Sequence, residues 1–281
     1  MSLKPENFAL VRKLVHERAA IVLEAGKEYL VESRLEPIAQ AHGFASVDEL
    51  CSLLRSKPGL ASEVVEAMTT NETSFFRDHH PFEALRREIL PQLFLRRAAR
   101  RTLRVWCAAC STGQEPYSLA MLLDEYFPQQ ASWDLRIDAT DVSRSVLARA
   151  KLGRYSQVEV NRGLSAALLV KYFVRDGLDW EINPQIKRRV RFSELNLIGN
   201  WPALEPYDLI FLRNVLIYFD QPTKLAILGR VRQQLAPDGY LLLGGSESTP
   251  AEVTAFTRLP IARAGIYRLK GSSRPSLSRA R

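Results

Sequence analysis

The spacing of hydrophobic residues along the chain changes near residue 75. Before that point, apolar residues recur every three or four positions, which is the period of an amphipathic helix. Three such faces are present: Phe8, Val11, Leu14 and Val15; Leu30, Val31, Leu35 and Ile38; and Val47, Leu50, Leu53 and Leu54. Strand-like patterns are missing here, so the sequence predicts an all-helical domain over residues 1–75.

After residue 75, short apolar runs alternate with helical patterns. The runs typical of strands are one that begins at Val105, then Trp133–Thr140, Val190–Glu194, Tyr207–Leu212 and Tyr240–Leu243. Helical patterns follow Pro116 and Ser143, and another covers about residues 222–235. Strands that alternate with helices form mostly parallel sheets. Residues 76–270 are therefore predicted to form one α/β domain.

A different pattern interrupts this domain. Residues Tyr172–Arg175 and Leu178–Ile182 flank Asp176-Gly177, a dipeptide suited to a tight hairpin turn. This predicts a small antiparallel β insertion at about residues 172–193. The end of the chain, residues 271–281, is polar and rich in Ser and Arg, which predicts a disordered tail.

The turn after the Val105 strand indicates a nucleotide-type cofactor. It leads through small residues into the start of a helix, where free backbone N–H groups can meet a ligand. It contains only Gly113, and no G-x-G-x-x-G or lysine-bearing phosphate loop is present, which disfavours a dinucleotide or ATP. Asp141 ends the next strand, where a carboxylate can accept both ribose hydroxyls. A ribose without a pyrophosphate suggests S-adenosylmethionine (SAM).

Three segments resemble one protein family. They are M-T-T-N-E-T-S-F-F-R-D (Met68–Asp78), A-C-S-T-G-Q-E-P-Y-S (Ala109–Ser118) and F-L-R-N-V-L-I-Y-F (Phe211–Phe219). In this order and spacing they closely resemble the CheR family of chemoreceptor glutamate methyltransferases. The resemblance extends from the first helices to about Lys270. It implies a Rossmann-like SAM-dependent methyltransferase domain that transfers a methyl group to receptor glutamates, forming methyl esters and S-adenosylhomocysteine (SAH).

The resemblance also implies the residues of the site. Arg77 and Tyr218 are the expected catalytic residues. The residues expected to bind the cofactor are Asn71, Thr73, Arg77, Glu115, Asp141, Asn196, Leu197, Arg213 and Asn214. No metal is implied.

The expected roles differ among these residues. Arg77 is expected to hold a carboxylate, because a guanidinium can bond both oxygens at once. Whether that carboxylate belongs to the cofactor or to the substrate glutamate stays open. Glu115 is expected to meet the cofactor's amino group, and Asn196 and Leu197 its adenine side. For Asn196, a turn or capping role is an equal alternative.

The substrate glutamate needs little chemical activation. Its carboxyl group has an ordinary pKa of about 4.3, so it is ionised at neutral pH without a strong base. Catalysis then depends on alignment, and positioning of this kind can supply roughly 7 to 11 kcal/mol. The Tyr218 hydroxyl is expected to orient the incoming carboxylate, and Arg213-Asn214 to close the far wall.

Composition and charge narrow the partners. The chain has 281 residues, 46% of them hydrophobic and 25% charged, and no run long enough to cross a membrane. The net charge of +8 raises an RNA methyltransferase as an alternative, but the basic runs lack interleaved aromatic residues, and an N-P-P-Y-type motif is absent. An acidic, glutamate-containing receptor helix explains the charge more economically, and nucleic acid is not expected. A non-catalytic module that binds SAM or SAH is a second alternative.

Three cysteines cannot form a disulfide framework, which favours a reducing, cytoplasmic location. Cys107-x-x-Cys110 and His79-His80 lack partner ligands at metal-site spacing, so redox and metal chemistry are not expected. We also expect a monomer.

Two family features depart from the usual pattern here. The helix that matches the family's basic receptor-binding helix carries Arg34 but also Glu28, Glu32 and Glu36. The β insertion is short, so we predict an enzyme that does not depend on a tethering peptide at the receptor's carboxyl end.

Overall fold

The computed structural model describes residues 3–202, 205–261 and 263–271. Its first part is the predicted helical domain. Four helices make up this domain: α1 (Pro5–Ala19), α2 (Glu28–Ala41), α3 (Val47–Ser52) and α4 (Pro58–Met68). The predicted apolar faces meet in one core, in which Val11, Val31 and Leu50 are fully buried. The prediction of an all-helical domain is confirmed.

The second part is built on a seven-stranded sheet. Its strands are β1 (Thr102–Ala108), β2 (Asp134–Asp141), β6 (Val190–Glu194), β7 (Tyr207–Leu212), β8 (Leu235–Leu243), β9 (Phe256–Arg258) and β10 (Ile266–Leu269). Their order is β6-β2-β1-β7-β8-β10-β9. The strands from β6 to β8 are parallel, and β10 is antiparallel to both neighbours. The predicted mostly parallel α/β domain is confirmed.

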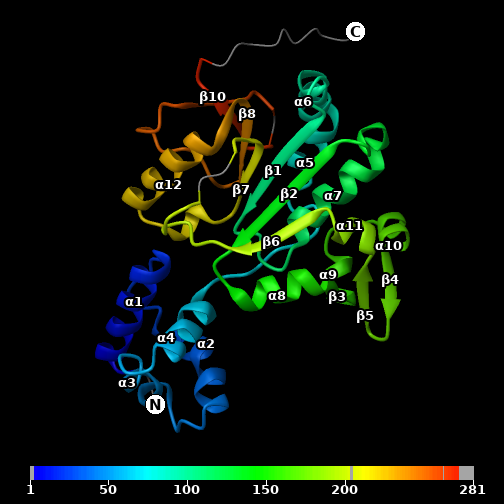
Figure 1. Cartoon of the computed structure of the whole chain (residues 1–281). Coiled ribbons are helices and arrows are strands. Elements are labelled where there is room, and N and C mark those ends of the chain that lie inside the picture. Colours follow the sequence, from blue (N-terminus) through cyan, green and yellow to red (C-terminus); the bar gives the residue numbers. More distant parts are fainter. Residues whose placement is uncertain (1–2, 203–204, 262, 272–281) are drawn as a thin grey trace.

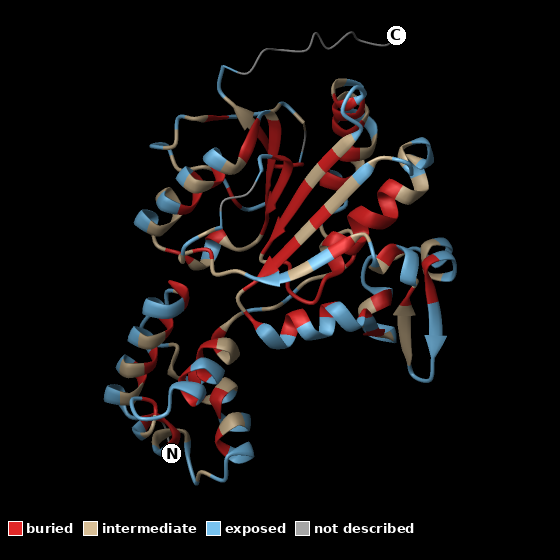
Figure 2. Ribbon diagram, viewed as in Figure 1, coloured by how far each residue is buried: buried red, intermediate tan, exposed pale blue. Residues whose placement is uncertain are grey.

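Helices cover both faces of this sheet (Figure 1). They are α5 (His80–Ala84), a π-helical turn (Leu85–Ile89), α6 (Leu90–Arg97), α7 (Gln114–Tyr126), the 3₁₀ turn η2 (Pro128–Gln130), α8 (Arg144–Leu152) and α12 (Gln221–Gln234). Because strand side chains alternate, Val105 and Cys107 of β1 join the core beneath α6 and α7, whereas Trp106 joins the core beneath α12. The central strands are buried on both faces (Figure 2), as expected for a parallel sheet.

A small antiparallel sheet forms the predicted insertion. Its strands, in the order β3-β5-β4, are β3 (Arg154–Ser156), β5 (Asp179–Ile182) and β4 (Phe173–Asp176), and helices α9 (Gln157–Asn161), α10 (Ala166–Tyr172) and α11 (Pro184–Lys187) accompany them. Asp176 pairs with Asp179 across the turn, and Gly177 has a φ of +63°, as a tight hairpin requires. The hairpin is confirmed. The insertion begins earlier than predicted, at Arg154, while β6 belongs to the main sheet.

One strand starts earlier than the sequence pattern indicates. Residues Pro237-Asp238-Gly239, which precede the predicted strand Tyr240–Leu243, lie inside β8, which begins at Leu235 opposite Tyr207. The pairing of β7 with β8 shifts in register between Tyr207 and Leu209, which accommodates these three residues in the strand. Arg97 holds the Asp238 carboxylate through hydrogen bonds of 2.5 and 2.8 Å. A tertiary ion pair therefore replaces a free loop.

The two domains meet at the carboxyl ends of the strands, with the helical domain below them in Figure 1. The Glu66 carboxylate at the end of α4 accepts hydrogen bonds from the Ser143 hydroxyl (2.5 Å) and the Ser145 N–H (2.6 Å) at the start of α8. The Asn196 amide donates to the Arg18 carbonyl at 2.6 Å. Among the described residues, no helix is long and apolar enough to cross a membrane. The predicted disordered tail lies, apart from Gly271, outside the described residues.

Candidate active site

A cavity lies between the two domains, with about 900 Å³ of empty space that includes its opening to solvent. All ten residues predicted for the site line it: Asn71, Thr73, Arg77, Glu115, Asp141, Asn196, Leu197, Arg213, Asn214 and Tyr218. The structure therefore brings together residues from the interdomain linker, the turn after β1, and the ends of β2, β6 and β7.

Asp141 sits at the end of β2 with both carboxylate oxygens engaged. One oxygen accepts from the Ser111 N–H at 2.8 Å and the other from the Ser143 N–H at 3.0 Å. Burial raises the pKa of Asp141, and these two backbone bonds act against that rise. Each oxygen has a second lone pair, so the carboxylate still has room to accept hydroxyl donors from the cavity.

The turn after β1 does not present its N–H groups as the sequence suggested. The N–H of Ser111 bonds Asp141, that of Cys110 bonds the Thr140 carbonyl, and that of Gly113 bonds the Cys110 carbonyl. These three N–H groups therefore bond the protein itself, and the N–H of Ser111 helps to hold Asp141 at the cavity.

Arg213 is the central cation of the site. Its guanidinium, 1% exposed, bonds Glu115 at 2.8 Å, Asp78 at 2.7 Å and the Arg77 carbonyl oxygen at 2.9 Å. Its Nε atom is buried without a hydrogen-bond partner. Burial raises the pKa of Glu115, and the positive charge of Arg213 opposes that rise. Glu115, expected to meet the cofactor's amino group, is therefore already paired with an arginine.

Arg77 stands on a strained turn beside this pair. Phe76, Asp78 and His79 all have positive φ angles, of 48°, 67° and 49°, which are costly for residues with side chains. The Arg77 guanidinium donates to the Glu72 carbonyl at 2.7 Å and contributes to the cavity wall. Arg213, whose side chain is buried, holds the same turn through Asp78, which is exposed, and through the Arg77 carbonyl, so this guanidinium supports the strained backbone.

The linker between the domains forms a further wall. The Asn71 amide donates to the Thr69 hydroxyl at 2.9 Å, and the Asn71 carbonyl accepts from the Ser111 hydroxyl at 2.8 Å. Arg34 of α2 donates to the Met68 and Thr69 carbonyls at 2.7 and 3.0 Å, which caps the end of α4. The one arginine expected for receptor contact is thus bonded to the linker.

Asn196 has the turn role that the sequence left open, and it also lies at the cavity, where the predicted contact with the cofactor's adenine side stays a prediction. It lines the cavity, its side-chain oxygen accepts from the Ile198 N–H at 3.1 Å as in an Asx turn, and its amide reaches Arg18. The helical domain adds Ala19 and Ile21 to the same cavity, which the sequence did not predict. Ala19 ends α1 and Ile21 lies in the loop that follows, so their place at the cavity depends on domain packing.

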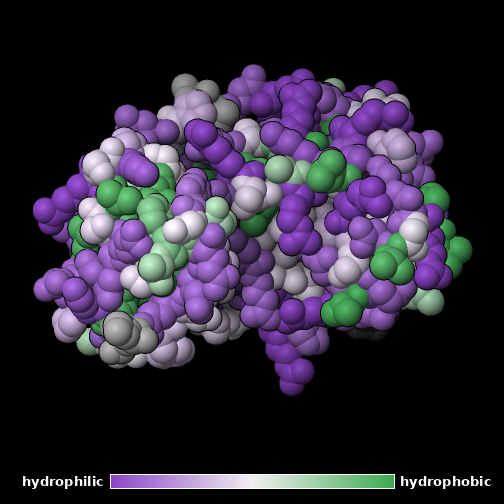
Figure 3. Space-filling view, turned by 90° about the horizontal axis from the view of Figure 1, so that it is seen from below, coloured by the Kyte–Doolittle hydropathy of each residue, from purple (hydrophilic) through white to green (hydrophobic). Residues whose placement is uncertain are grey.

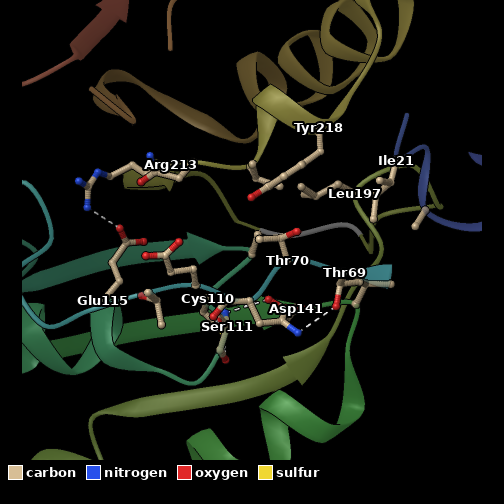
Figure 4. Close-up of a pocket in the computed structure, with 18 of the residues that line it drawn as sticks. Ile21, Thr69, Thr70, Cys110, Ser111, Glu115, Asp141, Leu197, Arg213 and Tyr218 are labelled. Carbon is tan, nitrogen blue, oxygen red and sulfur yellow. Dashed lines mark hydrogen bonds and ion pairs between the residues drawn. The ribbon is translucent and has the colours of Figure 1, made fainter. Parts of the chain in front are cut away.

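Tyr218 lies on the 3₁₀ turn η3 (Leu216–Tyr218) after β7. Its side chain points from that turn into the cavity, on the side opposite Asp141 and Ser111 (Figure 4). Its backbone carbonyl accepts from the Val22 N–H of the helical domain at 3.0 Å. A polar hydroxyl from the catalytic domain therefore enters the cavity where the two domains touch.

Comparison with known proteins identifies the family. Residues 6–69 match the description "CheR methyltransferase, all-alpha domain", and residues 71–264 match "CheR methyltransferase, SAM binding domain". The chain belongs to the CheR methyltransferase family. It is therefore a SAM-dependent methyltransferase, as the resemblance implied.

Three CheR-family relatives are similar over most of their length. Chemotaxis protein methyltransferase 1 of Pseudomonas aeruginosa is 42% identical over 96% of this chain and 100% of that protein. Chemotaxis protein methyltransferase Cher2 of Pseudomonas putida is 41% identical over 86% and 90%. A chemotaxis protein methyltransferase of Vibrio anguillarum is 36% identical over 96% and 99%. Among solved structures, the glycopeptide N-methyltransferase MtfA complexed with SAM matches 53% of this chain and 47% of that chain, at 18% identity and a TM-score of 0.33.

The chemistry of the cavity fits the SAM that the CheR family binds. Two carboxylates, the buried Asp141 and the largely buried Glu115, offer acceptors for ribose hydroxyls and for an ammonium group. In the described ranges, no group of three or more His, Cys, Asp or Glu residues could hold a metal ion. Cys107 and Cys110 are free and buried, and burial raises the pKa of both thiols. Neutral thiols at this depth are poor nucleophiles.

The basic runs of this CheR-family chain are largely neutralised inside the fold. Arg97 and Arg100 bond the fully buried Asp208 at 2.7 and 2.6 Å, and Arg97 also bonds Asp238. The run near residue 188 has two ion pairs, Lys187 with Glu181 at 3.1 Å and Arg189 with Asp124 at 2.6 Å. These ion pairs reduce the local positive charge of the two runs, whereas the net charge of +8, which raised the RNA alternative, is unchanged.

Proposed function

We propose that this enzyme transfers the methyl group of SAM to glutamate side chains of chemoreceptors, forming methyl esters and SAH. One observation carries the proposal: every residue that the family resemblance assigns to the site lines a single cavity. The relatives support it, because each is named a chemotaxis protein methyltransferase. The receptor glutamate itself is inferred from the family resemblance.

When bound, SAM supplies a sulfonium-linked methyl group, whose transfer to a carboxylate oxygen leaves the neutral thioether of SAH. The chain's own residues then act by position and charge. Asp141 holds the ribose hydroxyls of the cofactor, and Glu115 holds its amino group. Arg213 fixes the position of the Glu115 carboxylate. Arg77 and Tyr218 orient the glutamate carboxylate in line with the methyl group, and Leu197 and the linker exclude water.

No general base takes part in this proposal. The substrate glutamate is ionised at neutral pH, and the only bond it forms is to carbon, so no proton has to move. Arg77 suits a carboxylate partner, because among the described residues its guanidinium bonds only the Glu72 backbone carbonyl and pairs with no carboxylate. Arg213, by contrast, already has two carboxylate partners.

The proposed partner is the acidic, glutamate-containing cytoplasmic helical region of a receptor, so we place the reaction in the cytoplasm. Nucleic acid is not a proposed partner, and the proposal includes no receptor tether. The helix α2 presents Glu28, Glu32 and Glu36, and its arginine bonds the linker, so we propose that the receptor contact does not rely on a basic α2. On the face shown in Figure 3, hydrophobic residues form separate patches in a mainly hydrophilic surface, which supports a monomer.

The experiment is methylation of membranes that contain chemoreceptors, with the purified protein and methyl-labelled SAM. We expect label on the receptor that alkali releases as methanol, because esters hydrolyse and methylated bases do not. Alkali-stable label on RNA would support an RNA methyltransferase instead. SAH binding without any transfer would support a non-catalytic module. The matched control is a receptor in which glutamine replaces each labelled glutamate, in membranes without an enzyme that deamidates glutamine. This receptor should take up no label.

A further inference from the structure

A buried carboxylate outside the cavity holds the segment that carries Tyr218. Glu247 lies in the loop after β8, is 7% exposed, and accepts three backbone N–H bonds. Its Oε2 atom accepts from Asn214 at 2.7 Å and from Gly244 at 2.8 Å. Its Oε1 atom accepts from Ile217 at 3.3 Å. Two of the three donors belong to the segment from Asn214 to Tyr218.

The segment after β7 needs such an acceptor. Asn214 has a φ of +58°, a left-handed conformation that costs energy for a residue with a side chain. At this point the chain leaves the sheet, so the N–H groups of Asn214 and Ile217 have no strand partner. A buried N–H without a partner costs roughly 1 to 3 kcal/mol. The Glu247 carboxylate supplies partners for both and so favours the strained turn.

The loop that carries Glu247 is built for close approach. A Cβ atom placed on Gly244 would lie 2.7 Å from the Asn214 side-chain nitrogen and 2.8 Å from the Glu247 carboxylate. Only glycine leaves room for the carboxylate and the turn to meet there. Glu247 also raises the pKa of Glu115 through charge, although burial is the larger cause and Arg213 opposes it. The carboxylate is therefore close enough to act on the site while remaining outside the cavity wall.

We infer that Glu247 is a positioning residue for methyl transfer, which fixes the Asn214–Tyr218 segment and through it the Tyr218 hydroxyl. The inference rests on the proposed function. In this inference the effect of Glu247 does not extend to the residues proposed to hold the nucleoside. Asp141 and Ser111 lie on the other side of the cavity and bond one another directly. Loss of the Glu247 bonds moves Tyr218, and leaves the Asp141 side in place.

The test is Glu247→Gln, which keeps the size of the side chain but replaces one acceptor oxygen with a donor. Glu252→Gln is the matched control, since Glu252 is exposed in the same loop region and, within the described ranges, its carboxylate bonds only the Gln221 side chain. In Glu247→Gln we expect hydrogen exchange of the 214–218 amides to accelerate about 10-fold and kcat on receptor membranes to fall about 10-fold. Asn214 lines the cavity and is expected to contact the cofactor, so SAH affinity should also fall, but by a smaller factor than kcat, and the control should match the wild type in all three.

A double-mutant cycle with Tyr218→Phe tests whether Glu247 acts through Tyr218. If it does, Glu247→Gln reduces kcat far less in the Tyr218→Phe background than in the wild type. If the two substitutions reduce kcat independently, so that their factors multiply in the double variant, the inference is overturned. Unchanged hydrogen exchange of the 214–218 amides, or an unchanged kcat, in Glu247→Gln would also overturn it. If the wild type methylates no receptor, the proposed function fails, whereas the exchange experiment still decides whether Glu247 fixes the segment.

Discussion

Asp141→Asn is the most direct test of how the site holds its cofactor. The carboxylate receives the N–H groups of Ser111 and Ser143, one on each oxygen, and still faces the cavity. An asparagine has only one acceptor oxygen, so its NH₂ group must face either a backbone N–H or a ribose hydroxyl. The substitution therefore removes acceptor capacity on both the protein side and the cofactor side.

The size of the effect follows from these bonds. A hydrogen bond to a charged group contributes roughly 1.5 to 3 kcal/mol, so one lost ribose bond weakens SAH binding about 10- to 150-fold. A buried backbone N–H left without its acceptor lowers the free energy of unfolding by roughly 1 to 3 kcal/mol. The two losses are measured separately, by calorimetric titration with SAH and by denaturant unfolding of the unliganded protein.

Asp138→Asn is the matched control for this substitution. Asp138 lies on the same strand, bonds the Tyr207 hydroxyl at 3.2 Å, and is not part of the cavity wall. Its replacement should leave the SAH dissociation constant unchanged. If Asp141→Asn also leaves that constant within about twofold of the wild type, Asp141 does not bind the ribose.

The same carboxylate predicts a pH dependence. Burial raises the pKa of Asp141 in the unliganded protein, while hydroxyl donors on a bound ribose favour the ionised form. SAH affinity should therefore be full above this raised pKa and should decline as the pH falls through it, at a higher pH than for an ordinary aspartate. Titrations between neutral and mildly acidic pH should show the decline in the wild type but not in Asp141→Asn. Equal acid profiles would contradict this assignment.

Three further predictions concern other parts of the site. Arg77→Ala should lower kcat/KM about 10- to 150-fold through loss of a charge-assisted bond to a carboxylate. The SAH dissociation constant then shows whether that carboxylate belongs to the cofactor or to the substrate. Near-normal values of both quantities would refute a carboxylate-binding role for Arg77. Glu66→Gln should increase protease cleavage in the 69–73 linker. Burial acts to raise the pKa of Glu66, but hydrogen bonds from Ser143 and Ser145 lower it overall, so the contact between the two domains through Glu66 should persist until the pH falls through that lowered pKa. A linker that resists cleavage equally well in the variant would contradict this role of Glu66. Cys110 should react slowly with thiol reagents at neutral pH because burial raises its pKa, and bound SAH should slow it further; rapid alkylation in the presence of SAH would contradict its place in the cavity wall.

The sequence predicted the parts of the fold and site that local patterns determine. Helical and strand periodicity located the two domains, and a strand followed by Asp141 identified one wall of the cavity. The hairpin at Asp176-Gly177 was also predictable, because its turn needs a particular backbone conformation. In each case a short stretch of chain carries the whole signal.

The remaining features depend on residues far apart in the sequence. Nothing local indicates that Ile21 reaches the cavity, that Glu66 joins the domains, or that Glu247 supports the turn at Asn214. The same reason explains the early start of β8, since Arg97 is 141 positions from Asp238. The position of Arg34 was predictable, but its bonds to the linker were not.

Arg213 shows why the three segments that identified the family are the ones that matter physically. Its guanidinium extends from the end of β7 and bonds Asp78 in the first segment and Glu115 in the second. The Arg213 charge is buried, so loss of either carboxylate leaves it with only one partner, whereas Asp78 itself is exposed to solvent. The three segments are distant in the sequence, and they meet at this one side chain. Arg213 also holds Arg77 at the cavity, because its guanidinium bonds the Arg77 carbonyl oxygen and the carboxylate of the next residue, Asp78.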